Sequence, residues 1–209
     1  VSWQTVFLIF AAAILAVLFL LPMLSGPERP ASAEPEAPMG QVLNRALRDP
    51  SFTLIFVGFF SCGYQLGFVT AHFPAFVTEM CGPIAPGGML DSMGVSTTSA
   101  LGAIAISVIG LTNIAGTLAA GYLGNLFPRK YLLSAIYFGR TLAAAAFIIF
   151  PITPLTVLVF SAVMGALWLA TIPLTSGLVG YIYGLRYMGT LYGIVFLSHQ
   201  IGSFVGIWL

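Results

Sequence analysis

The chain has 209 residues, of which 59 % are hydrophobic and 6 % are charged, and its formal net charge is +1. Soluble domains carry about 25 % charged residues, so this composition leaves too little polar surface to cover a water-soluble globule. It excludes a cytosolic enzyme and a disordered tail, and the weak net charge offers no basic field for nucleic acid. Cys62 and Cys81 form no CxxC or Cys/His spacing, so no disulfide framework or metal site is predicted. The composition predicts an integral membrane protein.

Six apolar stretches are each long enough to cross a hydrocarbon core of about 30 Å, which takes roughly 20 residues of helix. None alternates with a period of two, as barrel strands do, and backbone groups inside lipid must bond to one another. The sequence therefore predicts an all-α membrane fold. The six predicted segments, numbered in chain order, are residues 3–24, 52 to about 77, 100–126, 131–150, 155 to about 178, and 188–209.

Basic residues lie in every second connection between these segments, which predicts the topology. They are Arg45, Arg48, Arg129, Lys130 and Arg186. The alternate connections, residues 78–99 and 151–154, hold no Lys or Arg. The positive-inside rule makes the basic side cytoplasmic. Both ends of the sequence lie inside apolar runs, which indicates an excerpt of a longer membrane protein.

The connection after the first segment is unlike the others. Residues 25–40 are rich in Pro, Ala and Glu, which predicts a flexible linker, and residues 41–49 predict a short amphipathic helix that Asp49-Pro50 closes. A signal peptide ending at Ala31-Ser32-Ala33 is the alternative for segment one. Its apolar run is longer than a typical h-region and no charged region precedes it, so a transmembrane helix is favoured.

Small residues recur every four positions on several helix faces, and this spacing lets helix backbones approach closely in lipid. Generic helix packing is the favoured interpretation, and rocking of helices during transport is the alternative. The sets are Ser198/Gly202/Gly206, Gly189/Gly193, Ala120/Gly124 and Gly63/Gly67.

Arg140 is the one charged residue predicted near the bilayer midplane, about 15 Å beyond Lys130 at 1.5 Å per residue. A buried arginine costs at least ~2.5 kcal/mol, so it needs a partner or a water-filled cavity. Because no acidic residue of this sequence is predicted at that depth, three partners remain open. They are a carboxylate outside this sequence, backbone carbonyl groups, and an anionic substrate.

His199 is predicted near mid-depth in segment six, with Gln200 beside it, and an imidazole can carry a proton at physiological pH. A neutral imidazole that bonds a neighbouring helix is the favoured interpretation, and an imidazole that carries a proton is the alternative. Gln65 and Asn113 fall near the middle of segments two and three, where they line a polar path or bond neighbouring helices. Pro173 predicts a kink in segment five, with nearby threonine hydroxyls satisfying the freed carbonyls.

Enzyme signatures are missing from the sequence, which has no HExxH, GxSxG, P-loop or aspartate-rich metal pair. No enzyme activity, cofactor or metal is therefore implied. The connection between segments three and four has a more specific pattern, residues 121–130. It resembles the loop signature of the major facilitator superfamily, which has a glycine, a leucine two residues later, an acid, and paired basic residues before the next helix. In this loop Gly121, Arg129 and Lys130 match, whereas Asn125 replaces the acid and Pro128 a common glycine.

The resemblance implies a twelve-helix fold of two six-helix bundles, of which this chain would hold six helices. Residues 1–24 would be the last helix of the N-terminal bundle, residues 25–50 the cytoplasmic central linker, and residues 51–209 the first five helices of the C-terminal bundle. The runs 67–76 and 189–193 look most like monocarboxylate and oxalate/formate carriers. Where those carriers have an acid and an arginine one turn apart, Asn113 and Thr117 stand instead, so that pair's mechanism does not transfer.

The sequence thus predicts a secondary active transporter in the plasma or inner membrane. It would move a small solute, such as an organic anion, by alternating access, with protons as a candidate coupling ion. Its partners would be the bilayer, the solute and the missing N-terminal bundle, without nucleic acid. The alternatives are a membrane-embedded enzyme and a non-transporting receptor or structural subunit. The candidate residues of the solute path are Gln65, Asn113, Arg140, His199 and Gln200.

Overall fold

Helices make up all the regular secondary structure in the described parts of the chain. The computed structural model describes residues 3–17, 37–92 and 94–209, which fall into two units, residues 1–36 and 37–209. In the first unit, α1 (Trp3–Val17) is an apolar helix of 15 residues. The rest of predicted segment one, the candidate signal-peptide cleavage site and most of the predicted linker lie outside the described residues.

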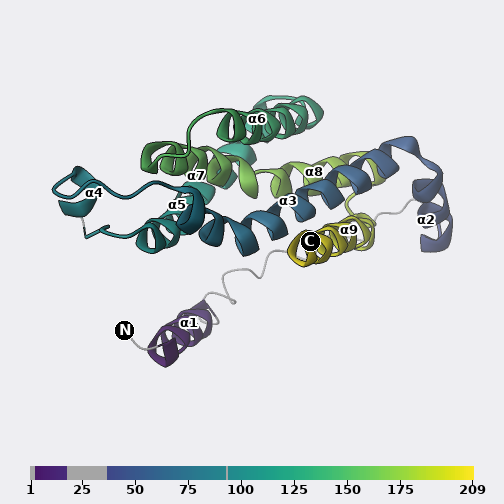
Figure 1. Ribbon diagram of the computed structural model, residues 1–209. Coiled ribbons are helices and arrows are strands. Elements are labelled where there is room, and N and C mark those ends of the chain that lie inside the picture. The colour runs from purple at the N-terminus through teal and green to yellow at the C-terminus, as the bar shows by residue number, and fades with distance from the viewer. Residues whose placement is uncertain (1–2, 18–36, 93) are drawn as a thin grey trace. The chain divides into compact units, whose positions relative to one another are not determined.

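Five membrane-spanning stretches of the second unit confirm predicted segments two to six, and each begins at or up to two residues before its predicted start (Figure 1). The fifth predicted segment is divided into α7 and α8, which together form one apolar span over Pro154–Tyr183. The helices are α2 (Met39–Arg48), α3 (Pro50–Met80), α4 (Met89–Ser92), α5 (Thr98–Leu126), α6 (Arg129–Ile149), α7 (Pro154–Trp168), α8 (Thr171–Tyr183) and α9 (Met188–Trp208).

Local sequence signals begin several of these helices. The Asp49 carboxylate accepts a hydrogen bond from the Ser51 N–H at 2.9 Å at the start of α3, where Pro50 occupies the first turn. Thr97 caps α5 and Thr153 caps α7 in the same way. Such oxygens satisfy amide groups that have no partner within the helix, and proline there removes a donor that would be unpaired. The starts of α3, α5 and α7 are therefore encoded locally.

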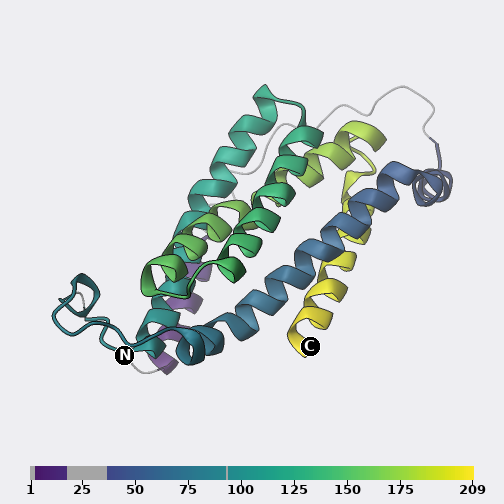
Figure 2. The ribbon, with the colours of Figure 1, turned by 45° about the horizontal axis from the view of Figure 1, so that its top comes forward.

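Glycines bring α3 and α9 into backbone contact, and the two helices run side by side in Figures 1 and 2. A Cβ atom added at Gly63 would meet the carbonyl oxygen of His199, and one added at Gly202 would meet that of Phe60. Ser203 Oγ donates to the Gly63 carbonyl at 3.0 Å across the same interface. The predicted small-residue faces at 63/67 and 202/206 therefore form one interface, in which dispersion contacts and hydrogen bonds replace a hydrophobic driving force.

A second close helix pair, α5 with α7, is built in the same manner. A Cβ at Gly116 would meet the carbonyl of Ala166, and one at Gly165 would meet Thr112 and Ile109. A buried apolar cluster joins this pair to the second half of α3. Another buried cluster, which includes Phe52 and Phe59, joins the first half of α3 to α8 and α9. The bundle thus has one apolar cluster toward each end, with the middle of α3 between them.

The helix predicted before segment two is present as α2, and its apolar side chains pack onto the bundle. Ala46 is buried in the cluster at the start of α3. The Tyr183 hydroxyl, at the end of α8, donates to the Asp49 carboxylate at 2.7 Å. This bond and the Ser51 N–H lower the pKa of Asp49 below its ordinary value. The carboxylate that caps α3 therefore stays ionised and also ties α3 to α8.

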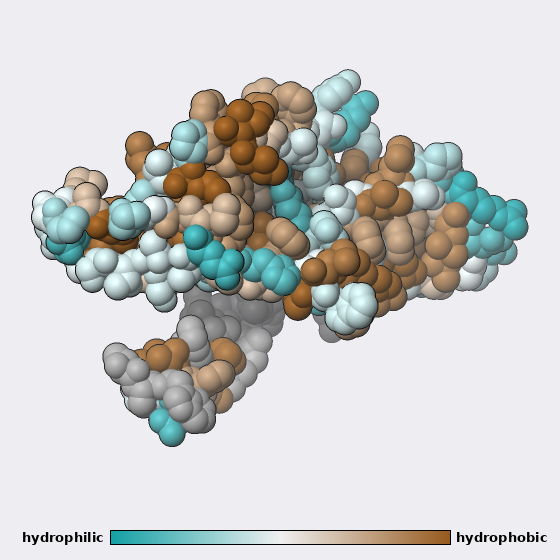
Figure 3. Space-filling model, in the orientation of Figure 1, coloured by the Kyte–Doolittle hydropathy of each residue, from teal (hydrophilic) through white to brown (hydrophobic). Residues whose placement is uncertain are grey.

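We call the end of the bundle that holds α2 the basic end. The helices α3, α6 and α9 begin there and α5 and α8 end there. Figure 3 shows hydrophilic residues gathered at the end that carries α2, and apolar residues over the helices next to it. The basic side chains of this end are Arg45, Arg48, Arg129, Lys130 and Arg186.

Replacing Gly202 by alanine is expected to destabilise the bundle, because the new Cβ would force α9 away from the Phe60 carbonyl. Overpacking of this kind costs about 1–3 kcal/mol. We expect the unfolding temperature of the purified protein, followed by tryptophan fluorescence, to fall by several degrees. Gly193→Ala in the same helix is the matched control, because Gly193 has open space around it and alanine favours helix. Equal effects of the two variants would contradict the proposed backbone contact.

Candidate functional site

A cluster of polar side chains is buried in the middle of the bundle, where four helices contribute to it. Arg140 of α6 donates from Nη1 to Cys62 Sγ of α3 at 2.9 Å. Thr171 Oγ1 of α8 lies 3.6 Å from the same sulfur atom. The side chain of His199 of α9 also interacts with Cys62. We call these four residues the polar cluster.

Helix geometry explains why the cluster forms at one level. At 1.5 Å per residue, Cys62, Arg140 and His199 lie roughly 16–18 Å from the starts of α3, α6 and α9. All three helices begin at the basic end, so these residues share one depth inside the membrane-spanning region. Arg140 is the one buried residue of α6, a helix whose residues are all described, and only 1 % of it is exposed. Its long side chain therefore carries a charge from an outer helix into the bundle.

The guanidinium has more donors than the described residues satisfy. Nη1 bonds to Cys62, and the Tyr137 ring lies 6.0 Å from the guanidinium carbon, but Nε and Nη2 are buried without a partner among the described residues. Buried polar groups in native proteins nearly always have partners, and a buried charge needs them most. The unpaired donors thus mark a position suited to an anionic group.

His199, the member of the polar cluster from α9, packs against aromatic rings. Its imidazole stacks on Phe196 at a centroid distance of 5.5 Å and lies 5.1 Å from the ring of Phe59. It is 6 % exposed, and its Nδ1 atom is buried without a described partner. Thr175 Oγ1 and the Tyr192 hydroxyl are buried and unpartnered in the same way. Several hydrogen-bonding atoms of α8 and α9 are therefore available to a polar ligand.

The break between α7 and α8 directly precedes Thr171. Proline at position 173 lacks the amide that would bond to the carbonyl of Leu169, so the regular ladder cannot continue through this turn. The Ile172 N–H bonds to Leu169 O at 3.0 Å, and Thr171 Oγ1 donates to Trp168 O at 3.4 Å. The sequence predicted a kinked helix with hydroxyl groups satisfying freed carbonyls. The structure agrees with this expectation, because residues 169 and 170 form a two-residue turn between α7 and α8, beside the polar cluster.

Asn113, a predicted path residue, lies at this break and not in the polar cluster. Its Oδ1 accepts the Leu169 N–H at 3.1 Å and the Thr117 hydroxyl at 3.4 Å. The Asn113 carboxamide therefore stabilises the interrupted helix from α5. The sequence left two roles open for Asn113, lining a polar path and bonding to a neighbouring helix, and these contacts fit the second role.

The structure brings together two of the five predicted path residues, Arg140 and His199. Gln65 is half-buried on α3 and Gln200 is exposed on α9. The four residues of the predicted loop motif lie in helices at the basic end, outside the polar cluster. Gly121 and Asn125 belong to the last turns of α5, and Arg129 and Lys130 begin α6.

Cys62 and Thr171 were missed as members of the site. Cys62 matches no disulfide or metal spacing, and a threonine close to Pro173 indicates only a hydroxyl at a kink. The signal that could have found Cys62 is depth, because it lies as far from the start of its helix as Arg140 does. Residues at equal depth on helices of known direction are candidates for contact.

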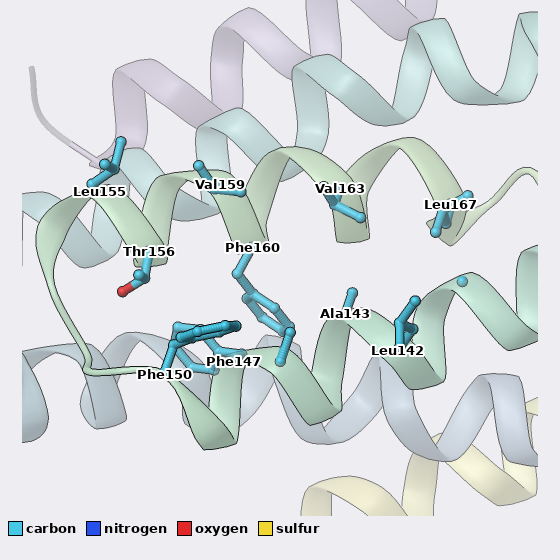
Figure 4. Close-up of a pocket in the computed structure, with 12 residues that line it drawn as sticks. Leu142, Ala143, Phe147, Phe150, Leu155, Thr156, Val159, Phe160, Val163 and Leu167 are labelled. Carbon is cyan, nitrogen blue, oxygen red and sulfur yellow. The ribbon is translucent and has the colours of Figure 1, made fainter.

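A cavity of about 520 Å³ lies elsewhere, between α6 and α7 (Figure 4). Its walls are aliphatic and aromatic, with Phe147, Phe150 and Phe160 on one side and Leu142 and Leu167 near the other. Such a lining offers a charged solute almost no hydrogen bonds. The polar cluster is therefore the better candidate site for a polar solute.

A helical bundle with five membrane-spanning stretches and a buried charged cluster defines the class of polytopic membrane proteins. The family model of the Major Facilitator Superfamily matches residues 1–207, so the chain belongs to the major facilitator superfamily. This match confirms the family that the loop at 121–130 indicated. No solved structure matches the chain.

A curated relative from Bacillus subtilis (strain 168), "Uncharacterized MFS-type transporter YcxA", is 26 % identical to the chain over 218 residues. The alignment covers 99 % of this chain and 49 % of the relative, so the chain spans about half the length of the curated relative that it matches. The name of the relative describes that protein as a transporter.

Removing the acceptor of Arg140 is expected to destabilise the bundle. Cys62→Val keeps an apolar side chain at this position but leaves the guanidinium without its bond, and hydrogen bonds to charged groups contribute about 1.5–3 kcal/mol. Arg140→Met removes the charge, and apolar replacement of buried charges is often neutral or stabilising. We therefore expect Cys62→Val to lower the unfolding temperature in the native background and much less in the Arg140→Met background. The same loss in both backgrounds would show that the two residues do not interact.

Proposed function

We propose that the full-length protein containing this chain is a secondary active transporter that carries a small organic anion by alternating access. The family supports transport as the general activity. The observation that supports an anion is Arg140, which is 1 % exposed and keeps two guanidinium nitrogens without a described partner. A carboxylate would supply two acceptors in the planar arrangement that a guanidinium binds best.

The break between α7 and α8 offers a way for the Arg140 guanidinium to become exposed. The short α8 carries Thr171 and Thr175 next to the polar cluster, and only two residues join it to α7. A tilt of α8 about residues 169 and 170 would uncover Arg140 without unfolding α7. Interrupted helices at the binding site are a recurring feature of transporters, because a break frees hydrogen-bonding groups and permits movement.

Proton coupling through His199 is the second part of the proposal. The titratable side chains around the Cys62 thiol are Tyr137 and Arg140 of α6 and Tyr192 and His199 of α9. None of these is a carboxylate, so a protonated imidazole would add a second positive charge beside Arg140. A bound anion offsets that repulsion, and by linkage each of the two ligands then favours the other. Anion and proton would move together.

The wider arrangement follows from the family and belongs to the same proposal. Residues 1–24 would close the N-terminal bundle, residues 25–50 would be the cytoplasmic linker, and residues 51–209 would begin the C-terminal bundle. The basic end would then face the cytoplasm of a plasma or inner membrane. Gln65 and Gln200 remain predicted path residues, which would contact the solute between the two bundles.

Replacing Arg140 by glutamine is expected to abolish uptake of the anion. The assay is uptake of radiolabelled carboxylates by proteoliposomes of the full-length protein, with sugars and amphipathic cations as comparison solutes. Arg140→Lys keeps the charge but loses the planar donors, so we expect it to retain part of the activity. Arg48→Gln, which removes an exposed arginine of α2, is the matched control and should transport normally. Normal carboxylate uptake by folded Arg140→Gln would refute the role of Arg140.

Replacing His199 by glutamine is expected to separate solute binding from proton coupling. In the native protein, an inward proton gradient should accelerate carboxylate uptake, and a proton ionophore should remove this acceleration. His199→Gln should lose the response to the gradient and keep exchange of labelled for unlabelled solute, which needs binding but no proton. A gradient response in this variant equal to that of the native protein would exclude His199 as the coupling residue.

A further inference from the structure

A second pocket lies at the basic end, between the loop that joins α5 to α6 and the last turns of α8. Its volume is about 370 Å³. Arg129 and Lys130 provide its charge, and Phe127, Leu178 and Tyr181 provide apolar and aromatic walls. None of the residues that line it is acidic. This combination is unlike the larger cavity between α6 and α7, which is lined almost entirely by apolar side chains.

The side chain of Arg129 lies close to two glycines. A Cβ atom added at Gly177 of α8 would lie 2.8 Å from Arg129 Nε, and one added at Gly124 of α5 would lie 3.9 Å from the same atom. Any larger residue at 177 would displace the guanidinium. Gly177 thus makes room for Arg129, whereas the distance at Gly124 is that of an ordinary van der Waals contact. Lys130 is exposed beside it, with its ammonium 5.0 Å from the centre of the Tyr131 ring.

The described protein groups near the pocket do not balance its two positive charges. Asn125, in the last turn of α5, is neutral, and residues 127 and 128 between α5 and α6 hold no carboxylate. Asp49 is the described carboxylate at the basic end, and its bonds go to Ser51 and Tyr183. Glu79 and Asp91 belong to the opposite end of the bundle, in the last turn of α3 and in α4. The pocket is therefore suited to an anion from outside the described chain.

The position of the pocket in the membrane indicates the kind of anion. The 21 residues of α6 span roughly 30 Å, about the thickness of the hydrocarbon core, so Arg129 and Lys130 at its start lie at the level of lipid phosphates. The pocket rim is apolar or aromatic, with Tyr181 81 % exposed and Phe127 55 % exposed. A free phosphate would use only the cations, whereas a phospholipid would use the cations and the rim. Aromatic side chains are typical of this interfacial region.

We propose that this pocket binds the phosphate headgroup of one anionic phospholipid. Arg129 and Lys130 contact the phosphate, and the acyl chains lie along Phe127, Leu178 and Tyr181. This site is separate from the polar cluster, and its occupation does not depend on the solute or on transport.

The experiment is native mass spectrometry of the full-length protein in mild detergent with added dioleoyl phosphatidylglycerol or dioleoyl phosphatidylcholine. The native protein should retain one phosphatidylglycerol in clear preference to phosphatidylcholine. Each cation near a lipid surface contributes about fivefold in affinity, so Arg129→Gln/Lys130→Gln should weaken phosphatidylglycerol binding by roughly 25-fold. Lys130→Gln alone, which changes an exposed residue and leaves the Arg129 packing intact, should weaken it by about fivefold. Arg45→Gln/Arg48→Gln makes the same change of charge at the same end, outside the pocket, and should keep the native preference.

Three results would overturn the proposal. The first is a native protein that retains both lipids equally. The second is an equal loss of binding in the α2 double variant, which would indicate a general surface charge effect. The third is displacement of phosphatidylglycerol by a large excess of inorganic phosphate, which would indicate a site for free phosphate and not for a lipid. Matching unfolding temperatures of the native protein and Lys130→Gln would confirm that the comparison is made between folded proteins.

Discussion

A guanidinium inside a membrane bundle is the constraint on which the centre of this structure depends. Moving an arginine to the middle of a bilayer costs at least ~2.5–3.5 kcal/mol, so its neighbours must supply hydrogen bonds or a ligand must do so. Arg140 is the one buried residue of the outer helix α6. Its charged side chain therefore points into the bundle at the middle of the membrane. The Cys62 sulfur and the polar atoms of α8 and α9 are arranged around that charge.

Backbone contact between α3 and α9 sets the geometry of the same cluster. Gly63 allows the backbone of α3 to touch the carbonyl of His199. This contact brings α9, and with it the His199 imidazole, beside Cys62, the residue that precedes Gly63. A side chain at 63 would push α9 outward and carry His199 away. Packing and the candidate chemistry are therefore coupled through one glycine, and the small-residue face is more than a general means of helix association.

Charges at the basic end are solvated, unlike the buried charge of Arg140. At the ends of the spans, water and lipid headgroups solvate cations, so Arg129 and Lys130 persist without a described acidic partner in their pocket. Asp49, in contrast, has protein partners, since its carboxylate caps α3 and also accepts a hydrogen bond from the Tyr183 hydroxyl. That contact joins the first membrane span after α2 to the end of α8, although the two residues are 134 positions apart in the chain.

The amino-acid sequence alone determined the membrane class, the positions of segments two to six and the family. These depend on the length of apolar runs and on the short loop at 121–130, which are local properties. It also placed Arg140 and His199 at mid-depth, because a helix advances by a constant amount per residue. Tertiary structure alone decided that Cys62 is the acceptor of Arg140 and that Asn113 supports a broken helix. Those pairings join residues 78 and 56 positions apart, and they depend on how each helix is rotated about its axis, which no local pattern specifies.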